Sequence, residues 1–319
     1  MIISRTPFRI SFAGGGSDFQ EYYRHEPGAV VSSTIDKYMF LSMHPLFNSN
    51  GYHLKYSKNE IVDDLSQIQH PIIREVFSDY LISGVDFNSS SDVPSGTGLG
   101  SSSSFTTGLI NLCNTYKNIY IKKENIAKEA CEIEIGRLQS PIGKQDQYAA
   151  AVGGLNFIQF NPDESVNIDK IHLSEDVRKK LENSLLLFYT GDNRASSSIL
   201  SEQKNNITKK YSTLKKMVTL AENMRDELKN DSIFNFGKIL HESWIYKKEL
   251  AVNITNSSID HFYDTAMNNG AEGGKLLGAG ASGFLLFFVP LHRQERIRKL
   301  LGLYELHFKF EYSGTTIIY

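Results

Sequence analysis

The sequence predicts an α+β fold, in which strands and helices are both abundant and partly segregated along the chain. Residues 2–12 alternate with a period of two, and residues 29–43 are rich in β-branched and aromatic side chains, so both segments are expected to be strands. Residues 196–268 have the character of long helices, and a short apolar strand, 283–289, follows them. The chain therefore combines a strand-rich first part with a helix-rich second part.

The remaining elements follow from the same patterns. After the first strand, Ala13-Gly14-Gly15-Gly16-Ser17-Asp18 predicts a tight glycine-rich turn, and Ser140-Pro141 is a helix-start signal. The expected strands are 2–12, 29–43, 51–57, 85–93, 155–160, 185–190, 283–289, 306–312 and 315–318. The expected helices are 71–81, 105–116, 124–138, a short alanine-rich helix ending at Gly153, 196–229, 233–252, 258–268 and 291–301.

The length of 319 residues accommodates one large domain or two of ordinary size. The character of the chain changes near residues 185–194, where a buried strand gives way to long helices. We therefore expect an N-terminal domain of residues 1–188 and a C-terminal domain of residues 189–319.

Composition excludes several classes of function. A net charge of −2 gives no general attraction to nucleic acid or anionic membranes. The longest apolar run, 284–289, is too short to span a membrane, and Arg5 and Arg9 interrupt any signal-peptide pattern at the N-terminus. Cys113 and Cys131 lie on apolar helix faces and are expected to be small buried hydrophobic residues. These features predict a reduced, cytoplasmic protein without a zinc site.

The stretch most indicative of chemistry is Pro94-Ser95-Gly96-Thr97-Gly98-Leu99-Gly100-Ser101-Ser102-Ser103-Ser104. Its alternating glycines let the backbone turn tightly near a ligand, and the N-terminus of the helix that follows favours a phosphate. A flexible Gly/Ser linker is the alternative, but a linker is not expected to lead directly into an amphipathic helix. The loop lacks both the Gly-Lys-Ser/Thr of a Walker A motif and the G-x-G-x-x-G spacing.

One carboxylate is predicted to face inward. Glu134 lies on the apolar stripe of the expected helix 124–138, four residues from both Ala130 and Leu138. A buried carboxylate is costly unless it is paired or binds a cation. Metal ligation and a structural salt bridge are both compatible with this position.

A second acidic residue, Asp146, stands in Gly143-Lys144-Gln145-Asp146-Gln147 at the start of a helix of small residues. An aspartate there can simply stabilise the helix N-terminus. A functional role would require a nearby cation and a substrate hydroxyl, and Arg9 is a candidate for that cation. Arg9 could also be an ordinary edge charge.

A third glycine-rich segment, 270–283, precedes the apolar strand 284–289. A simple hairpin rarely needs so many glycines, so we expect the backbone to approach a ligand closely there.

Three segments, in order, resemble the signature motifs of the GHMP small-molecule kinases: Arg5–Asp18, Pro94–Ser104 and Lys275–Gly283. The ordered trio covers nearly the whole chain and is highly specific, whereas one glycine run would not be. The first motif is most similar to the branch that phosphorylates sugars at the anomeric carbon. That branch includes D-glycero-D-manno-heptose 7-phosphate kinases and bacterial fucose kinases.

The resemblance implies the GHMP kinase fold, with an N-terminal ribosomal-protein-like βαβ domain, a C-terminal ferredoxin-like domain and the active site between them. It also implies ATP and Mg²⁺. The residues that would hold the ATP phosphates are Pro94, Gly96, Thr97, Gly98, Leu99, Gly100, Ser101, Ser102 and Ser103. Ser102 and Glu134 match the magnesium ligands of the family.

The resemblance implies catalytic roles for two residues. Asp146 matches an aspartate proposed to act as a base or to orient the attacking hydroxyl, and Arg9 matches an arginine near the transferred phosphoryl group. Asp18 matches an acid that binds sugar hydroxyls. The substrate contacts implied in this way are Arg9, Gly15, Gly16, Ser17, Asp18, Asp146, Gly280 and Gly283.

The sequence departs from the family pattern at two places. Ala281-Ser282 stands where the third motif often continues with glycines, so contacts there are expected to differ. Gly15-Gly16-Ser17 replaces the Glu-His-Thr of galactokinase-like members, which argues against galactose.

An acceptor that already carries a phosphate needs a further anion site. Arg194 and the serines after it, at the start of a long helix, are suited to an anion, although a simple helix cap is equally compatible with them. We expect a compact, kinase-only protein without the fused nucleotidyltransferase of the long fucose kinases, which favours the heptose phosphate over fucose.

The expected reaction is transfer of the γ-phosphoryl group of MgATP to the C1 hydroxyl of D-glycero-D-manno-heptose 7-phosphate. The 1,7-bisphosphate would feed nucleotide-activated heptose synthesis for surface polysaccharide. The alternatives are a kinase for fucose or another unphosphorylated sugar, and a catalytically silent sugar- or nucleotide-binding regulator. The expected partners are small molecules, and the protein is expected to be a monomer or a homodimer.

Overall fold

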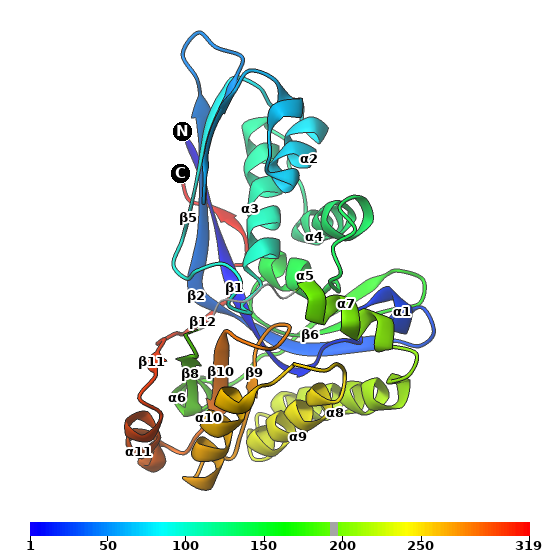
Figure 1. Ribbon diagram of the computed structural model, residues 1–319, viewed down its shortest axis with the longest axis vertical. Helices are drawn as coiled ribbons and strands as arrows, with labels where there is room; N and C mark the ends of the chain where they lie inside the picture. Colours follow the sequence, from blue (N-terminus) through cyan, green and yellow to red (C-terminus); the bar gives the residue numbers. More distant parts are fainter. Residues whose placement is uncertain (192–196) are drawn as a thin grey trace.

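The computed structural model describes residues 1–191 and 197–319. It is elongated, with a large sheet and its helices at one end and a smaller sheet with its helices at the other (Figure 1). The two chain termini lie side by side on the large sheet (Figure 1).

The large sheet is organised by two long antiparallel strands, β1 (Ile2–Gly14) and β2 (Gly28–Pro45). The C-terminal half of β2 pairs with β5 (Val85–Ser91), and its N-terminal half pairs with β6 (Leu155–Phe160). β2 can pair with both because it is 18 residues long. The pairing of β1 with β2 shifts register at Pro7/Phe8 and Ser11/Ala13, and such irregularities bend strands. The remaining strands are β3 (Tyr52–Lys55) and β4 (Asn59–Val62) beyond β5, β7 (Val166–Lys170) beside β6, β12 (Phe310–Glu311) on β2 and β13 (Thr316–Ile317) on β1.

Helices cover the large sheet. α3 (Ser101–Tyr116) packs on both β1 and β2, and α2 (Pro71–Asp79) lies against α3 (Figure 1). α4 (Lys123–Cys131) continues into a π-helical turn, η2 (Glu132–Arg137), before α5 (Gln145–Val152). Two short elements, α1 (Gln20–Tyr23) and η1 (Leu65–Gln67), lie in connections.

The small sheet is antiparallel, in the order β11 (Tyr304–Glu305), β8 (Leu185–Tyr189), β10 (Phe284–Phe288) and β9 (Gly273–Leu276). The helices of this part of the chain are α6 (Glu175–Ser184), α7 (Ser197–Asn206), α8 (Tyr211–Lys229), α9 (Phe236–Lys248), α10 (Ser257–Asn268) and α11 (Leu291–Leu301). α8 contacts β1 and β2, whereas α9 contacts both β1 and the small sheet.

The hydrophobic core is continuous between the two sheets. The Phe236 ring on α9 lies 5.1 Å from the Phe12 ring on β1 and 5.3 Å from the Phe288 ring on β10. All three residues are buried in one cluster, so α9 joins the two sheets. Trp244 on the same helix is fully buried in the neighbouring cluster.

Most expected elements are present, with shifted ends. α3 begins at Ser101 rather than 105, and the helix expected over 196–229 is broken between α7 and α8. The helix-start signal at Ser140-Pro141 is wrong, because α5 begins only at Gln145. Elements that the sequence patterns did not predict are α1, β4, η1, β7, α6, β9 and β11.

The strands β12 and β13 belong to the expected C-terminal domain but pair in the large sheet. β8 lies mostly in the expected N-terminal domain but pairs in the small sheet. The division into residues 1–188 and 189–319 stays a prediction.

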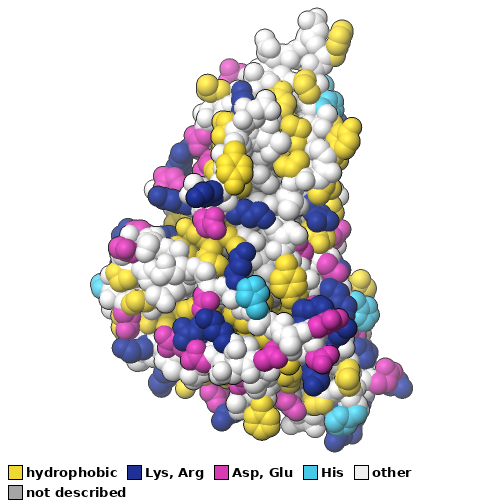
Figure 2. All heavy atoms as spheres, turned by 180° about the vertical axis from the view of Figure 1, so that it is seen from behind, with side chains coloured by type: hydrophobic (Ala, Val, Ile, Leu, Met, Phe, Trp, Pro, Cys, Tyr) yellow, Lys and Arg dark blue, Asp and Glu magenta, His cyan; other side chains and the backbone are white. Residues whose placement is uncertain are grey.

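Within the described chain, no helix is both long enough and apolar enough to cross a membrane. The face turned away from Figure 1 carries basic and acidic side chains interspersed rather than gathered by sign (Figure 2). Cys113 and Cys131 are buried free thiols, as expected.

Candidate active site

A cavity of about 350 Å³ opens where the turn after β1, the Gly/Ser loop, the start of α5, the helices α7–α9 and the loop after β9 meet. The predicted site residues that line it are Arg9, Gly15, Gly16, Asp18, Gly96, Gly98, Gly100, Ser101, Ser102, Ser103, Asp146 and Gly280. The structure thus gathers residues from all three motifs around one space.

Other predicted residues lie behind this wall. Ser17 is fully buried and its hydroxyl hydrogen-bonds to the backbone of Ala29, and the Thr97 hydroxyl donates to the Pro94 carbonyl. The predicted residues absent from the wall are Pro94, Thr97, Leu99, Ser17, Glu134 and Gly283. Arg194 lies outside the described residues.

The Gly/Ser loop presents its backbone to the cavity. Gly96, Gly98 and Gly100 have φ values of 78°, 86° and 77°, a region that side-chain-bearing residues rarely adopt. Gly100 is the N-cap of the 16-residue helix α3 and provides no side-chain cap. The first N–H groups of α3 are therefore free to bind an anion at the cavity wall.

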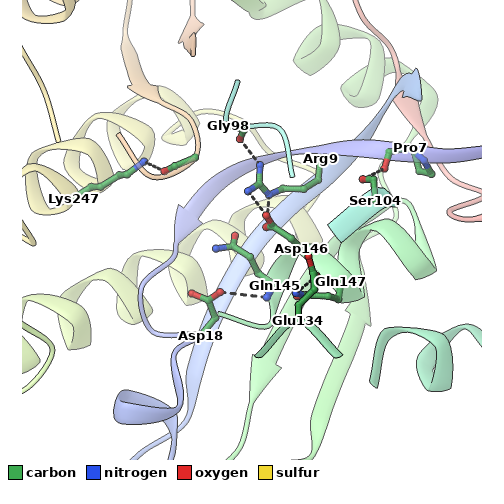
Figure 3. Close-up of polar contacts among 11 residues, drawn as sticks. Pro7, Arg9, Asp18, Gly98, Ser104, Glu134, Gln145, Asp146, Gln147 and Lys247 are labelled. Atoms are coloured by element: carbon green, nitrogen blue, oxygen red, sulfur yellow. Dashed lines mark hydrogen bonds and ion pairs between the residues drawn. The ribbon is translucent and has the colours of Figure 1, made fainter. Parts of the chain in front are cut away.

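Arg9 and Asp146 form a bidentate pair at the centre of the site (Figure 3). Arg9 Nε and Nη2 donate to the two Asp146 oxygens at 2.7 and 2.8 Å, and Arg9 Nη1 donates to the Gly98 carbonyl at 2.6 Å. Arg9 is 4% exposed. The pair fixes the Asp146 carboxylate beside the Gly/Ser loop, and the alternative of an isolated edge charge at Arg9 is wrong.

Glu134 is buried, as its place on the apolar stripe predicts (Figure 3). Its two oxygens accept hydrogen bonds from the Ser102 hydroxyl at 2.8 Å and from the Gln147 amide at 2.7 Å. Burial raises the pKa of Glu134, and the two hydrogen bonds oppose that effect. Its position in the π-helical turn η2 is typical of functional sites, since the extra residue re-aims the side chains of the helix.

Asp18 is also buried and lines the cavity. Its Oδ2 accepts a hydrogen bond from the Gln145 backbone N–H at 3.3 Å, whereas its Oδ1 has no partner among the described residues. Burial, reinforced by the nearby Asp146 charge, raises the pKa of Asp18 to about 6. Gly143 is required beside it, because a Cβ at that position would lie 2.0 Å from Oδ2.

The glycines of the third motif pack on the Gly/Ser loop. A Cβ on Gly278 would lie 2.4 Å from Gly98 Cα, and one on Gly283 would lie 2.3 Å from the Thr97 carbonyl oxygen. These two glycines thus allow backbone-to-backbone contact between the motifs. Ala281 has a φ of 65°, so the departure from the glycine pattern is accommodated in a strained conformation.

Two lysines that sequence reasoning did not assign also line the cavity, Lys247 on α9 and Lys275 on β9. Lys247 shares the buried face of α9 with Leu240 and Trp244, so the periodicity argument used for Glu134 could have found it. Lys275 is the first residue of the third motif, whose glycines dominate its sequence signal.

Comparison with known proteins shows to which family the chain belongs. The model of the GHMP kinases N-terminal domain matches residues 65–154. The chain is 31% identical to D-glycero-alpha-D-manno-heptose 7-phosphate kinase of Campylobacter jejuni, over 94% of this chain and 93% of that protein. It is 26% identical to the bifunctional fucokinase/GDP-fucose pyrophosphorylase of Arabidopsis thaliana, over 96% of this chain but only 31% of that protein.

Solved structures show the same fold. A D-glycero-D-manno-heptose 1-phosphate kinase from Bacteroides thetaiotaomicron has a TM-score of 0.82 at 23% identity, over 100% of this chain and 99% of the other. A putative sugar kinase from Campylobacter jejuni has a TM-score of 0.73 at 27% identity, over 99% and 97%.

The protein is therefore an enzyme, a phosphotransferase with an alcohol group as acceptor. It belongs to the GHMP kinase family, whose fold it has and whose phosphate donor is ATP.

The residues present fit a magnesium ion. Within residues 1–191 and 197–319, no group of three His, Cys, Asp or Glu side chains could hold a metal by itself. Mg²⁺, however, is commonly bound by one or two carboxylates together with substrate phosphates and water. The Ser102 hydroxyl and the buried Glu134 carboxylate, next to the N-terminus of α3, supply such a partial ligand set.

Proposed function

We propose that this protein transfers the γ-phosphoryl group of MgATP to the C1 hydroxyl of D-glycero-D-manno-heptose 7-phosphate. The product would be the 1,7-bisphosphate, an intermediate for nucleotide-activated heptose. The observation that carries the proposal is the cavity itself, where the Gly/Ser loop, the Arg9–Asp146 pair and Asp18 meet.

The chain is a sugar kinase of the GHMP family, similar to heptose phosphate kinases. The finer assignment is supported by the identity to the Campylobacter jejuni heptose 7-phosphate kinase over nearly the full length of both chains. Asp18 Oδ1, which has no hydrogen-bond partner within residues 1–191 and 197–319, also supports a sugar, since a buried carboxylate oxygen in a cavity wall is suited to accept a hydrogen bond from a ligand hydroxyl.

The mechanism we propose relies on positioning and charge, which dominate phosphoryl transfer. The N–H groups of α3 bind the nucleotide phosphates, and Asp18 binds sugar hydroxyls. Asp146 orients the attacking hydroxyl or accepts its proton, while Arg9 holds Asp146 in place and balances charge on the transferred group. Ser102 and Glu134 would hold Mg²⁺, which neutralises phosphate charge when bound.

The test is ADP release from MgATP with D-glycero-D-manno-heptose 7-phosphate, with L-fucose and D-mannose in parallel and phosphorus NMR of the product. Turnover on the heptose phosphate with a new anomeric phosphate signal is the expected result. Turnover only on a free sugar would keep the kinase and overturn the heptose assignment. Absence of ADP release with every sugar would favour the silent regulator.

A further inference from the structure

Two buried cations in the cavity wall have no place in the proposed mechanism. Lys247 and Lys275 are 8% and 3% exposed and come from α9 and β9. Lys247 Nζ donates to the carbonyls of Leu276, at 2.8 Å, and Gly278, and Lys275 Nζ donates to the Phe12 carbonyl at 3.1 Å. In the described part of the chain, neither ammonium group has a carboxylate within ion-pair distance.

The charge around these lysines is unbalanced. Arg9 is the nearby third cation, and Asp146 already neutralises it through two hydrogen bonds. Burial, together with repulsion from Arg9, lowers the pKa of Lys275 to about 7, and burial, together with repulsion from Lys275 and Arg9, lowers that of Lys247. Burial without a counter-charge disfavours the charged form of both lysines, and a bound anion would favour that form again.

The lysines also lie beside the phosphate-binding backbone. Lys247 donates to the carbonyl of Gly278, Gly278 packs on Gly98, and the carbonyl of Gly98 accepts a hydrogen bond from Arg9. In Figure 3, Lys247 extends from its helix toward the side of the site where Arg9 and Gly98 lie. Lys247 and Lys275 line the same cavity as Gly96, Gly98 and Gly100 of the Gly/Ser loop.

We propose that Lys247 and Lys275 form a phosphate subsite of the cavity, which takes the dianion of a phosphate monoester or of a terminal nucleotide phosphate. This inference rests on the proposed function, which supplies the identity of the acceptor. Two sources share this chemistry: the phosphate that the acceptor already carries, and the γ-phosphate of ATP.

The test uses Lys247→Met and Lys275→Met, which remove the charge and keep much of the side-chain volume. Lys238→Met, at an exposed position on α9, is the matched control. Calorimetric titrations with inorganic phosphate, MgADP, MgATP and D-glycero-D-manno-heptose 7-phosphate are compared with thermal unfolding of each free variant.

The expected result is a rise of tenfold or more in the Kd of at least one phosphate ligand, without a lower melting temperature. Loss of MgATP binding with MgADP binding retained identifies the γ-phosphate as the source. Loss of heptose phosphate binding with MgATP binding retained identifies the acceptor phosphate.

Two results would overturn the subsite. One is that all Kd values stay within twofold of wild type. The other is that all ligands, MgADP included, weaken together with a lower melting temperature, as expected if the lysines only tether the loop after β9. If the heptose phosphate does not bind to the wild-type protein, the proposed acceptor is wrong, and the inorganic phosphate and nucleotide titrations still decide the subsite.

Discussion

Asp146 is the residue on which the proposed chemistry depends most directly. We expect Asp146→Asn to lower kcat by about 10²- to 10⁴-fold, the usual contribution of a positioned acid–base group. The Kd of MgADP should change little, because the proposed mechanism assigns nucleotide binding mainly to the Gly/Ser loop. Steady-state kinetics and calorimetry check both values.

Asp79→Asn is the matched control for this variant, since it weakens another arginine–aspartate pair, with Arg137, that lies away from the cavity. Its kcat should equal that of wild type. An unchanged kcat in Asp146→Asn would remove Asp146 from the mechanism.

We expect the Asp18 carboxylate to lower the stability of the folded protein and to contribute to sugar binding. Its pKa in the folded protein, about 6, lies above the ordinary 3.8, so the native state binds this proton more tightly than the unfolded state does. Stability is therefore lost as the pH rises from about 4 to about 6, and the penalty persists above that range. We expect Asp18→Asn to raise the free energy of unfolding by on the order of 2–3 kcal/mol at pH 8 and by less at pH 5.

The same substitution should raise the KM for the sugar if Asp18 binds it as proposed, because an uncharged amide with one acceptor oxygen replaces a carboxylate with two. Chemical denaturation at the two pH values and sugar saturation curves measure these effects. A variant that is less stable at pH 8 would show that the Asp18 carboxylate is structural rather than reserved for a ligand.

At the scale of elements, the third motif packs directly on the Gly/Ser loop, to which the proposed mechanism assigns the nucleotide phosphates. Gly283 does not line the cavity, yet a Cβ there would meet the Thr97 carbonyl at 2.3 Å. We expect Gly283→Ala to displace the loop and raise the Kd of MgADP by tenfold or more. Calorimetric titration measures that change.

Gly302→Ala is the control, because Gly302 also has a positive φ, of 60°, but a Cβ added there would have no atoms within 4 Å. This variant should lose stability, by about 1 kcal/mol, and keep its nucleotide affinity. Equal nucleotide affinity in both variants would mean that the contact between the two motifs does not shape the binding loop.

At the scale of the whole molecule, α9 packs against both sheets, so we expect the two sheets to unfold together. Phe236 is buried between Phe12 and Phe288, and truncation of such a residue costs about 3–5 kcal/mol. We expect Phe236→Ala to lower the unfolding midpoint seen by Trp244 fluorescence and by far-UV circular dichroism to the same extent.

Phe234→Ala provides the comparison, since Phe234 lies two residues before Phe236 and is 86% exposed. The unfolding midpoint of this variant should stay near that of wild type. Separate transitions from the two probes, with only one moved by Phe236→Ala, would show that the sheets unfold independently.

The sequence by itself determined the elements with strong periodicity and the chemistry of short motifs. The alternation of β1, the apolar stripe that carries Glu134 and the turn-and-helix pattern of the Gly/Ser loop are local properties, so spacing alone predicts them. The resemblance of the three motifs then sufficed to identify the family and its fold.

Only the tertiary structure decided which residues share the cavity. The Arg9–Asp146 pair spans 137 positions, and the lysines of α9 and β9 reach the site through packing that no local pattern encodes. The roles of Gly278 and Gly283 were likewise invisible in the sequence, because a glycine that contacts a ligand and one that contacts another backbone leave the same local signal. Such contacts join residues far apart in the sequence, so they depend on how the elements pack together rather than on any local pattern.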